Sequence, residues 1–233
     1  MSFISSLFTA EGLKQLILWI PVILFSISFH EFAHGWVAYK LGDPTAKNAG
    51  RLTLNPIKHF NPFGFLMMLI VHFGWATPVP VDPANFKKPR QGMLYTAVAG
   101  PIANIILALI SSLLYAILYV SLENVTAASS FAISLIRYTA LLLLYFIYMN
   151  IGLAVFNLIP VYPLDGSRIL EFFMPYKYQT FMMKYGQYIQ LAFMLIVILT
   201  SVVGTVIGTV QSVVANVFVD VWIALIKFFV NIF

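Results

Sequence analysis

The chain contains no cysteine. This absence excludes disulfide bonds, thiolate nucleophiles and every zinc site that depends on cysteine. Any metal ion that the protein holds must therefore be bound by histidine, aspartate or glutamate.

Charged residues are scarce as well. Only 9% of the 233 residues are charged and 61% are hydrophobic, whereas an ordinary soluble domain is charged at about a quarter of its positions. Charge is missing altogether from residues 15–30, 91–122, 138–164 and 185–219. All but the first of these stretches exceed the roughly 20 residues that cross a bilayer, so we expect an all-α polytopic membrane protein.

About five transmembrane helices are expected, over residues 13–38, 93–120, 131–158, 187–209 and 213–233. With no internal repeat and no long polar insertion, we expect one integral membrane domain over 1–233. Its motif-bearing core covers about 15–170, and its C-terminal helices cover about 187–233.

Residues 40–76 differ from the rest of the chain. The stretch "GRLTLNP", residues 50–56, alternates apolar and polar residues, which predicts a strand or small β-hairpin after the first helix. The apolar run 63–76 is too short to cross a bilayer, which predicts a re-entrant or interfacial element.

The net charge of +5 has a topological explanation. Basic residues gather in segments 40–90 and 160–186, and segment 121–130 has none. Basic segments between apolar helices stay in the cytoplasm, so we expect both to be cytoplasmic and no nucleic-acid partner. The sequence does not indicate an oligomeric state.

Two histidines and a glutamate end the first apolar run, in "SISFHEFAHGWVAY", residues 26–39. His30 and His34 are four positions apart, so on a helix both rings project from one face and can share a metal ion. Two imidazoles suit zinc, and Glu31 beside them can take a proton from an attacking water. An interfacial position, with Glu31 paired to Lys40, would explain these residues without a metal.

A catalytic zinc ion needs a third protein ligand and one open position. His59 lies in the basic segment, where we expect it to be solvated, and His72 could be a buried or gating residue in the short apolar run. Asp165 is the strongest candidate, because the prolines and glycine around it in "NLIPVYPLDGSRIL" break the helix and turn the carboxylate out of it. An aspartate that caps the next short helix is the alternative.

These residues resemble the site-2 protease family of intramembrane zinc metalloproteases. His30-Glu31-x-x-His34 is similar to the first motif of that family, and the stretch from Asn157 to Gly166 is similar to the second. "AGPIANIILA", which contains Asn104, resembles a third. The match is to a compact form, because 233 residues leave no room for the PDZ or nucleotide-sensing domain that many members carry.

The resemblance implies one Zn²⁺ per chain, with His30, His34 and Asp165 as ligands and Glu31 as the general base. It implies Asn157 as a polar group near the oxyanion and Asn104 as a helix-packing or substrate-binding residue. The expected reaction is hydrolysis of a peptide bond in or near a transmembrane segment of a substrate protein. We expect a bacterial or archaeal cell membrane, with the active site toward the cytoplasm.

Two other functions are compatible with the same residues. One is a membrane protein that binds metal without hydrolysis, although such a binder has no need for the general base Glu31. The other is a membrane metallohydrolase that acts on an amide outside proteins.

Overall fold

The computed structural model describes residues 9–71, 74–123 and 129–230, and all regular structure in these ranges is helical. Five of these helices are long and apolar enough to cross a membrane, which confirms the expected polytopic all-α architecture. They are α2 (Ala10–Lys40), α6 (Pro89–Glu123), α7 (Ser130–Asn157), α9 (Tyr176–Leu199) and α10 (Val202–Val230).

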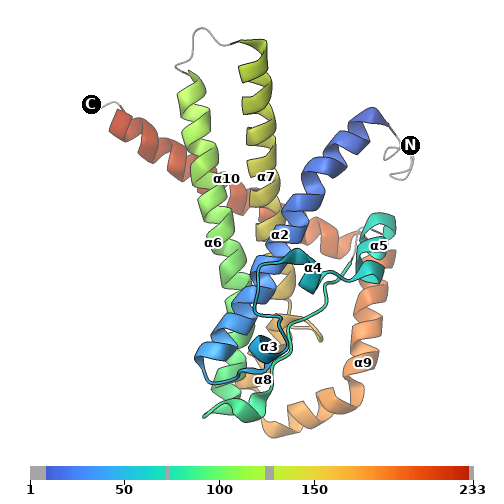
Figure 1. Ribbon diagram of the computed structural model, residues 1–233. Helices are drawn as coiled ribbons and strands as arrows, with labels where there is room; N and C mark the ends of the chain where they lie inside the picture. Colours follow the sequence, from blue (N-terminus) through green and yellow to red (C-terminus); the bar gives the residue numbers. More distant parts are fainter. Residues whose placement is uncertain (1–8, 72–73, 124–128, 231–233) are drawn as a thin grey trace.

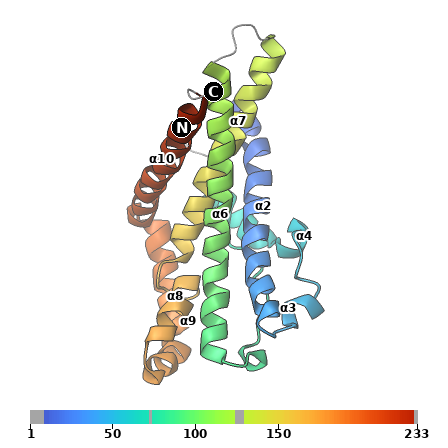
Figure 2. The ribbon, with the colours of Figure 1, turned by 90° about the vertical axis from the view of Figure 1, so that its left-hand side faces the viewer.

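Helix α6 is the centre of the fold. It contacts α2, α7, α10 and the short helix α8 (Asp165–Phe173), and in Figures 1 and 2 α2, α6 and α7 run side by side. Ala108 of α6, Ile147 and Ile151 of α7, and Ala215 of α10 form a buried apolar cluster. Small residues such as these alanines allow membrane helices to approach closely.

The loop after α2 is fixed by a buried aspartate. Gly42 has a φ of 108°, a conformation that favours glycine and ends the helix. Asp43 then accepts hydrogen bonds from the N–H of Thr45 (3.0 Å), the N–H of Asp82 (2.8 Å) and Asn85 Nδ2 (2.8 Å). Burial, the largest single effect, raises the pKa of Asp43, but a bond from the Thr45 hydroxyl, together with these bonds, lowers it on balance below its ordinary value. The carboxylate therefore ties the end of α2 to the short helix η1 (Pro83–Asn85).

The prediction of a β-hairpin after the first helix is wrong. In the described part of this region two short helices, α3 (Thr45–Asn48) and α4 (Pro56–His59), occur and no strand does. The Asn55 side chain accepts a hydrogen bond from the N–H of Ile57 and begins α4 where the pattern predicted a strand. Leu52 lies toward Gly35 of α2 and Leu54 is exposed, so the alternation comes from a loop lying on a helix.

Helix α5 (Pro62–Val71) is too short to cross a bilayer. Its place relative to the membrane stays a prediction. Residues 72–73, and with them His72, lie outside the described part of the chain.

The predicted boundaries of the last two helices are wrong, although both helices exist. Helix α9 begins eleven positions earlier than residue 187, directly after Pro175, because it continues beyond the uncharged stretch and includes Lys177 and Lys184. The break between α9 and α10 falls at Thr200, which has extended backbone angles and donates its hydroxyl to Ile196 O at 2.7 Å. The glycines after it lie inside α10.

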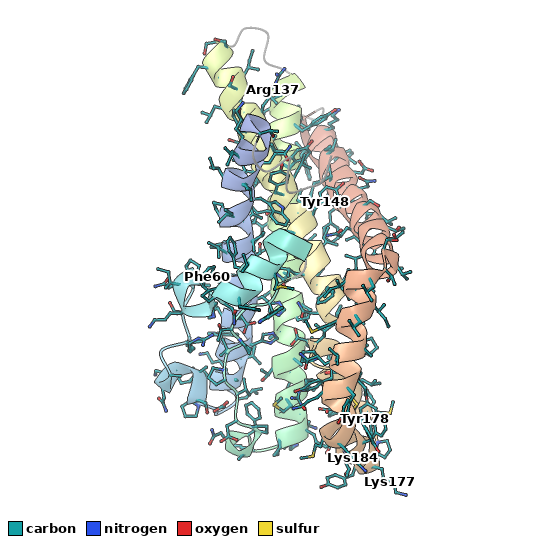
Figure 3. The ribbon with its side chains drawn as sticks, turned by 90° about the vertical axis from the view of Figure 1, so that its right-hand side faces the viewer. Phe60, Arg137, Tyr148, Lys177, Tyr178 and Lys184 are labelled. Atoms are coloured by element: carbon teal, nitrogen blue, oxygen red, sulfur yellow. The ribbon has the colours of Figure 1, made fainter. Side chains whose placement is uncertain are left out.

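Basic residues of distant segments meet at one end of the molecule (Figures 1 and 3). Helices α3 and α8 and the Lys40 end of α2 lie at one end, and α6 and α7 meet at the other (Figure 1). Lys177 and Lys184 lie far from Arg137, which is near the start of α7 (Figure 3). Parts of both basic segments thus lie at one end of the molecule, whereas α4 and α5, which belong to segment 40–90, lie about halfway along it (Figure 1).

Candidate metal centre

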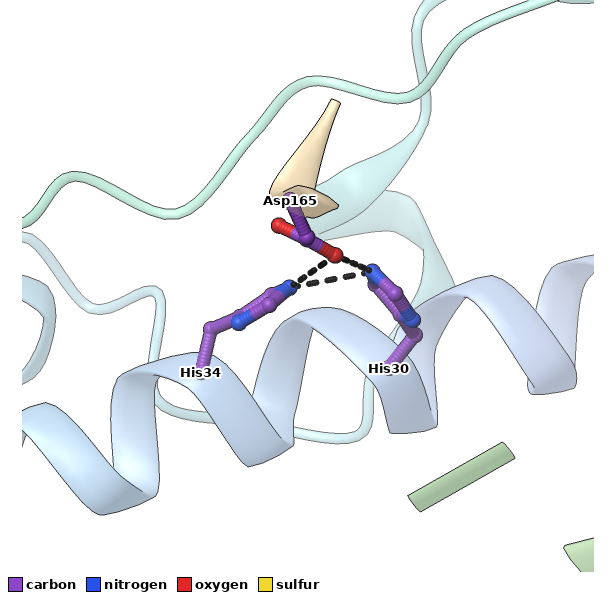
Figure 4. A group of neighbouring side chains, drawn as sticks. All are labelled: His30, His34 and Asp165. Carbon is purple, nitrogen blue, oxygen red and sulfur yellow. Dashed lines mark hydrogen bonds and ion pairs between the residues drawn. The ribbon is translucent and has the colours of Figure 1, made fainter. Parts of the chain in front are cut away.

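Three potential metal ligands from distant parts of the chain converge beside α2 (Figure 4). His30 and His34 lie one turn apart on that helix, and Asp165 is the first residue of α8. The two Nε2 atoms are 3.0 Å apart, and Asp165 Oδ2 is 3.2 Å from His30 Nε2 and 3.3 Å from His34 Nε2. Both rings are buried.

The other nitrogen of each ring is already used. His34 Nδ1 is 2.7 Å from the carbonyl oxygen of Thr96, which can only accept, so Nδ1 carries the hydrogen. His30 Nδ1 is 2.5 Å from Asn104 Oδ1, which likewise accepts. In the neutral rings both Nε2 atoms then carry lone pairs, and these face each other and the carboxylate.

This arrangement fits a metal ion. Asp165 Oδ2 is buried and receives no conventional hydrogen bond in the described structure, so three electron-pair donors face one another. Such a cluster is unfavourable unless a cation lies between its members. Zinc bonds of 2.0–2.1 Å in a tetrahedral site place neighbouring ligand atoms about 3.3 Å apart, close to the separations found here.

Gly100 allows α6 to pass directly over the two rings. A Cβ atom at this position would lie 2.4 Å from His34 Nε2 and 2.5 Å from His30 Cε1, far inside van der Waals contact. No side chain larger than hydrogen fits there while the rings keep their positions.

Asp165 is held by contacts at both ends of α8. At the start, a Cβ on Gly166 would lie 2.3 Å from the carbonyl oxygen of Leu158, so glycine lets the chain turn back on the end of α7. At the far end, Arg90 Nη2 donates to the carbonyl oxygens of Glu171, Phe172 and Met174, at 3.3, 2.7 and 2.8 Å. A cation there also suits the negative end of the helix dipole.

Glu31 lies next to the histidines, and its carboxylate contacts the loop before α6. Its Oε2 atom accepts a hydrogen bond from the N–H of Val79 at 2.8 Å. The partner is thus a backbone group, not Lys40.

The two asparagines implied by the resemblance have different surroundings. Asn157, the last residue of α7, donates through Nδ2 to Leu153 O at 2.9 Å and has no direct bond to the three ligands. Asn104 is fully buried and bonds to His30, so the structure places it behind the metal centre. His59, expected to be solvated, is buried, with Nε2 bonded to Thr53 O at 2.8 Å.

Several supporting residues escaped the sequence analysis, although a signal for them exists. Positions 26, 30 and 34 of α2 are spaced by four, as are positions 96, 100 and 104 of α6, and the two rows face each other in antiparallel order. Small or polar residues at this spacing mark a closely packed helix face. Comparing the two rows would have indicated the contact of Thr96 and Gly100 with the histidines.

The chain is similar to known metalloproteases. A family model described as peptidase family M50 matches residues 18–201. The "Putative zinc metalloprotease YwhC" of Bacillus subtilis is 44% identical over 156 residues, which cover 67% of this chain and 68% of that protein.

Two mycobacterial relatives are more distant. The "Putative zinc metalloprotease Rip2" of Mycolicibacterium smegmatis and that of Mycobacterium tuberculosis H37Rv are each 29% identical, over 64% of this chain and 54% of those proteins. No solved structure matches the chain. From the extent of the family match and the identity to the Bacillus protein, this chain belongs to peptidase family M50, the site-2 protease family.

Proposed function

We propose that the protein is a zinc-dependent intramembrane endopeptidase that cleaves a transmembrane segment of another protein. The observation that carries the proposal is the convergence of Asp165 with His30 and His34, which lie beside Glu31 on a helix that is apolar enough to cross a membrane. One Zn²⁺ per chain would be held by these three side chains.

A zinc ion held by these three side chains would supply Lewis-acid chemistry, which makes water nucleophilic near neutral pH and polarises a peptide carbonyl. Glu31 accepts the proton that the attacking water loses. When the bond between carbonyl carbon and nitrogen breaks, Glu31 returns this proton to the leaving amine. The hydrogen bond from the N–H of Val79 occupies one carboxylate oxygen of Glu31, which leaves the other oxygen for proton transfer.

Asn157 is proposed to stabilise the charge that develops on the carbonyl oxygen. Its Nδ2 atom has two hydrogens, and the bond to Leu153 O uses one of them. The second can donate to the oxyanion, the usual role of such an amide in acyl transfer.

A cavity of about 280 Å³ offers space for an apolar substrate segment. Its walls include Ile27 and Ser28, which precede Glu31 by one turn on the same face of α2, and Phe156, which precedes Asn157. A substrate helix must unwind before its carbonyls can react, because they are hydrogen-bonded within the helix. The cavity is well placed to hold side chains of the unwound stretch.

Two further features remain proposals. We assign the protein to the cytoplasmic membrane of a bacterium or archaeon, with the metal centre toward the cytoplasm, on the distribution of basic residues. We also propose a membrane-protein or peptide substrate, because the centre lies among apolar helices.

The test compares wild type with Glu31→Gln in zinc content and in cleavage of transmembrane-peptide substrates. We expect about one zinc per chain in both proteins, and a loss of cleavage of at least about 100-fold in the variant, because amide cannot take up the proton. Zinc in both with cleavage in neither, across a broad substrate panel, would favour a binder without hydrolysis. Absence of zinc from both would refute the proposal.

A further inference from the structure

A chain of buried polar side chains leads from the metal centre to α7. His30 Nδ1 lies 2.5 Å from Asn104 Oδ1, and Asn104 Nδ2 donates to Asn150 Oδ1 at 2.7 Å. Asn150 Nδ2 donates to Ser26 Oγ at 2.9 Å and to the carbonyl oxygen of Phe146 at 2.8 Å. Asn104, Asn150 and Ser26 are completely buried, so water cannot replace any of these contacts.

A backbone carbonyl determines which way the two amides in this series of hydrogen bonds are oriented. Phe146 O can only accept, so the amide of Asn150 must turn its NH₂ group toward it and its oxygen toward Asn104. Asn104 must then present its own NH₂ group to Asn150, which turns Asn104 Oδ1 to His30. The carbonyl of Ser26, 3.5 Å from Asn104 Nδ2, favours the same orientation through a longer contact.

The orientation of Asn104 determines the tautomer of His30, a proposed metal ligand. Because Asn104 offers an acceptor to Nδ1 of His30, the neutral ring carries its hydrogen there and leaves the Nε2 lone pair free. Nε2 is the atom that faces His34 and Asp165. If the amide of Asn104 were reversed, its NH₂ group would meet Nδ1 and favour the other tautomer, which puts a hydrogen where the metal binds.

We propose that Asn150 is a positioning residue of the metal centre: through the orientation of the Asn104 amide, it holds His30 in the tautomer whose Nε2 atom can bind metal. The inference rests on the proposed metal site and adds α7 to the helices that determine it. Outer groups that orient a histidine ligand are generally worth 10–100-fold in metal affinity.

The experiment uses the full-length chain in lipid nanodiscs and compares wild type, Asn150→Leu and the double variant Asn104→Asp/Asn150→Leu. Leucine is branched at Cγ like asparagine and cannot hydrogen-bond, although its side chain is larger. Aspartate at position 104 presents an oxygen on both arms, so it can accept from His30 without orientation by Asn150. Ser112→Ala, which removes a buried hydroxyl bonded only to Leu109 O in its own helix, is the matched control.

Two quantities are measured. The ¹⁵N NMR spectrum of histidine-labelled, zinc-free protein reports the His30 tautomer, assigned by comparison with His30→Gln. Competition with a chelator reports zinc affinity. We expect wild type and Ser112→Ala to carry the hydrogen on Nδ1, Asn150→Leu to show mixed tautomers and a 10–100-fold loss of zinc affinity, and the double variant to recover both.

The proposal is overturned if Asn150→Leu folds and keeps the wild-type tautomer and zinc affinity, or if the double variant recovers neither. A fall in thermal stability with an unchanged tautomer would likewise mean that Asn150 only packs α7 in place. If the leucine variant does not fold, Asn150→Ala, with and without Asn104→Asp, gives the same comparison. Wild type that shows the Nδ1 tautomer but binds no zinc would refute the proposed function. The orientation of His30 by Asn150 through Asn104 would then still stand.

Discussion

Gly100 is needed at the candidate metal centre because it has no side chain, which leaves space for the rings of His30 and His34. The two imidazoles lie directly beneath its Cα atom, and the next residue, Pro101, lies inside the same helix. The motif that the sequence analysis noticed around Asn104 therefore has two functions in the structure. Gly100 gives the rings space, and Asn104, one turn later on the same face, accepts a hydrogen bond from His30.

At this scale we predict that Gly100→Ala disrupts metal binding. The added methyl group would lie about 2.4 Å from His34 Nε2, so the rings or α6 must shift, and we expect a loss of zinc affinity of about tenfold or more. Chelator competition measures it. Gly204→Ala makes the same change in α10, where the new Cβ meets no atom within 4 Å. Equal zinc affinity in the two variants would contradict the prediction.

At the scale of elements, the short helix α8 must hold Asp165 in position. It has nine residues, fewer than an isolated helix needs for stability in water, and its first residue, Asp165, is the proposed third metal ligand. Its position therefore depends on contacts with other elements. Arg90, near the start of α6, provides one by donating to three carbonyl oxygens at the end of α8.

We predict that Arg90→Ala loosens α8 and speeds the loss of zinc to a chelator by about three- to tenfold, the equivalent of roughly 1 kcal/mol for exposed hydrogen bonds. Arg90→Lys should recover only part of this, since an ammonium group cannot reach several carbonyls as a guanidinium does. Lys87→Ala removes the same charge from the same segment and serves as the control. Wild-type zinc release in Arg90→Ala would show that α8 is held by its other contacts.

At the scale of the whole molecule, the charge distribution gives an orientation. The Lys40 end of α2 and helix α8 lie at the same end of the bundle, and the start of α7 lies at the other (Figure 1). If the basic segments stay in the cytoplasm, as we propose, the loops around α3 and α8 face inward and the start of α7 faces outward.

The absence of native cysteine allows a direct test of this orientation. We predict that Ser130→Cys, at the start of α7, is labelled by a membrane-impermeant maleimide on intact bacterial cells. Thr180→Cys, which is exposed near Lys177, should be labelled only after the cells are opened. The cysteine-free parent corrects for background labelling. The reverse pattern would place the metal centre on the opposite side of the membrane.

Local chemistry in the sequence determined much of this protein. The scarcity of charge and the length of the apolar runs were sufficient to predict five spanning helices, because the bilayer imposes helical structure on any apolar segment of that length. The spacing of His30 and His34 was sufficient to identify a shared helix face, and the broken helix before Asp165 indicated a carboxylate turned out of its helix. These inferences required no knowledge of which helices meet.

What only the tertiary structure decided depends on contacts between distant segments. The pattern of residues 50–56 fits a strand, but a strand needs a partner, and in the structure Leu52 lies toward α2 while α4 begins at Pro56. The end of α9 depends on a local break at Thr200 that hydropathy does not reveal. Above all, whether His30 presents Nε2 to a metal depends on hydrogen bonds that pass through α6 to α7. A hydrogen bond between residues far apart in sequence leaves no periodic signature, so the sequence supplies the ligands and the packing of three helices determines their tautomers.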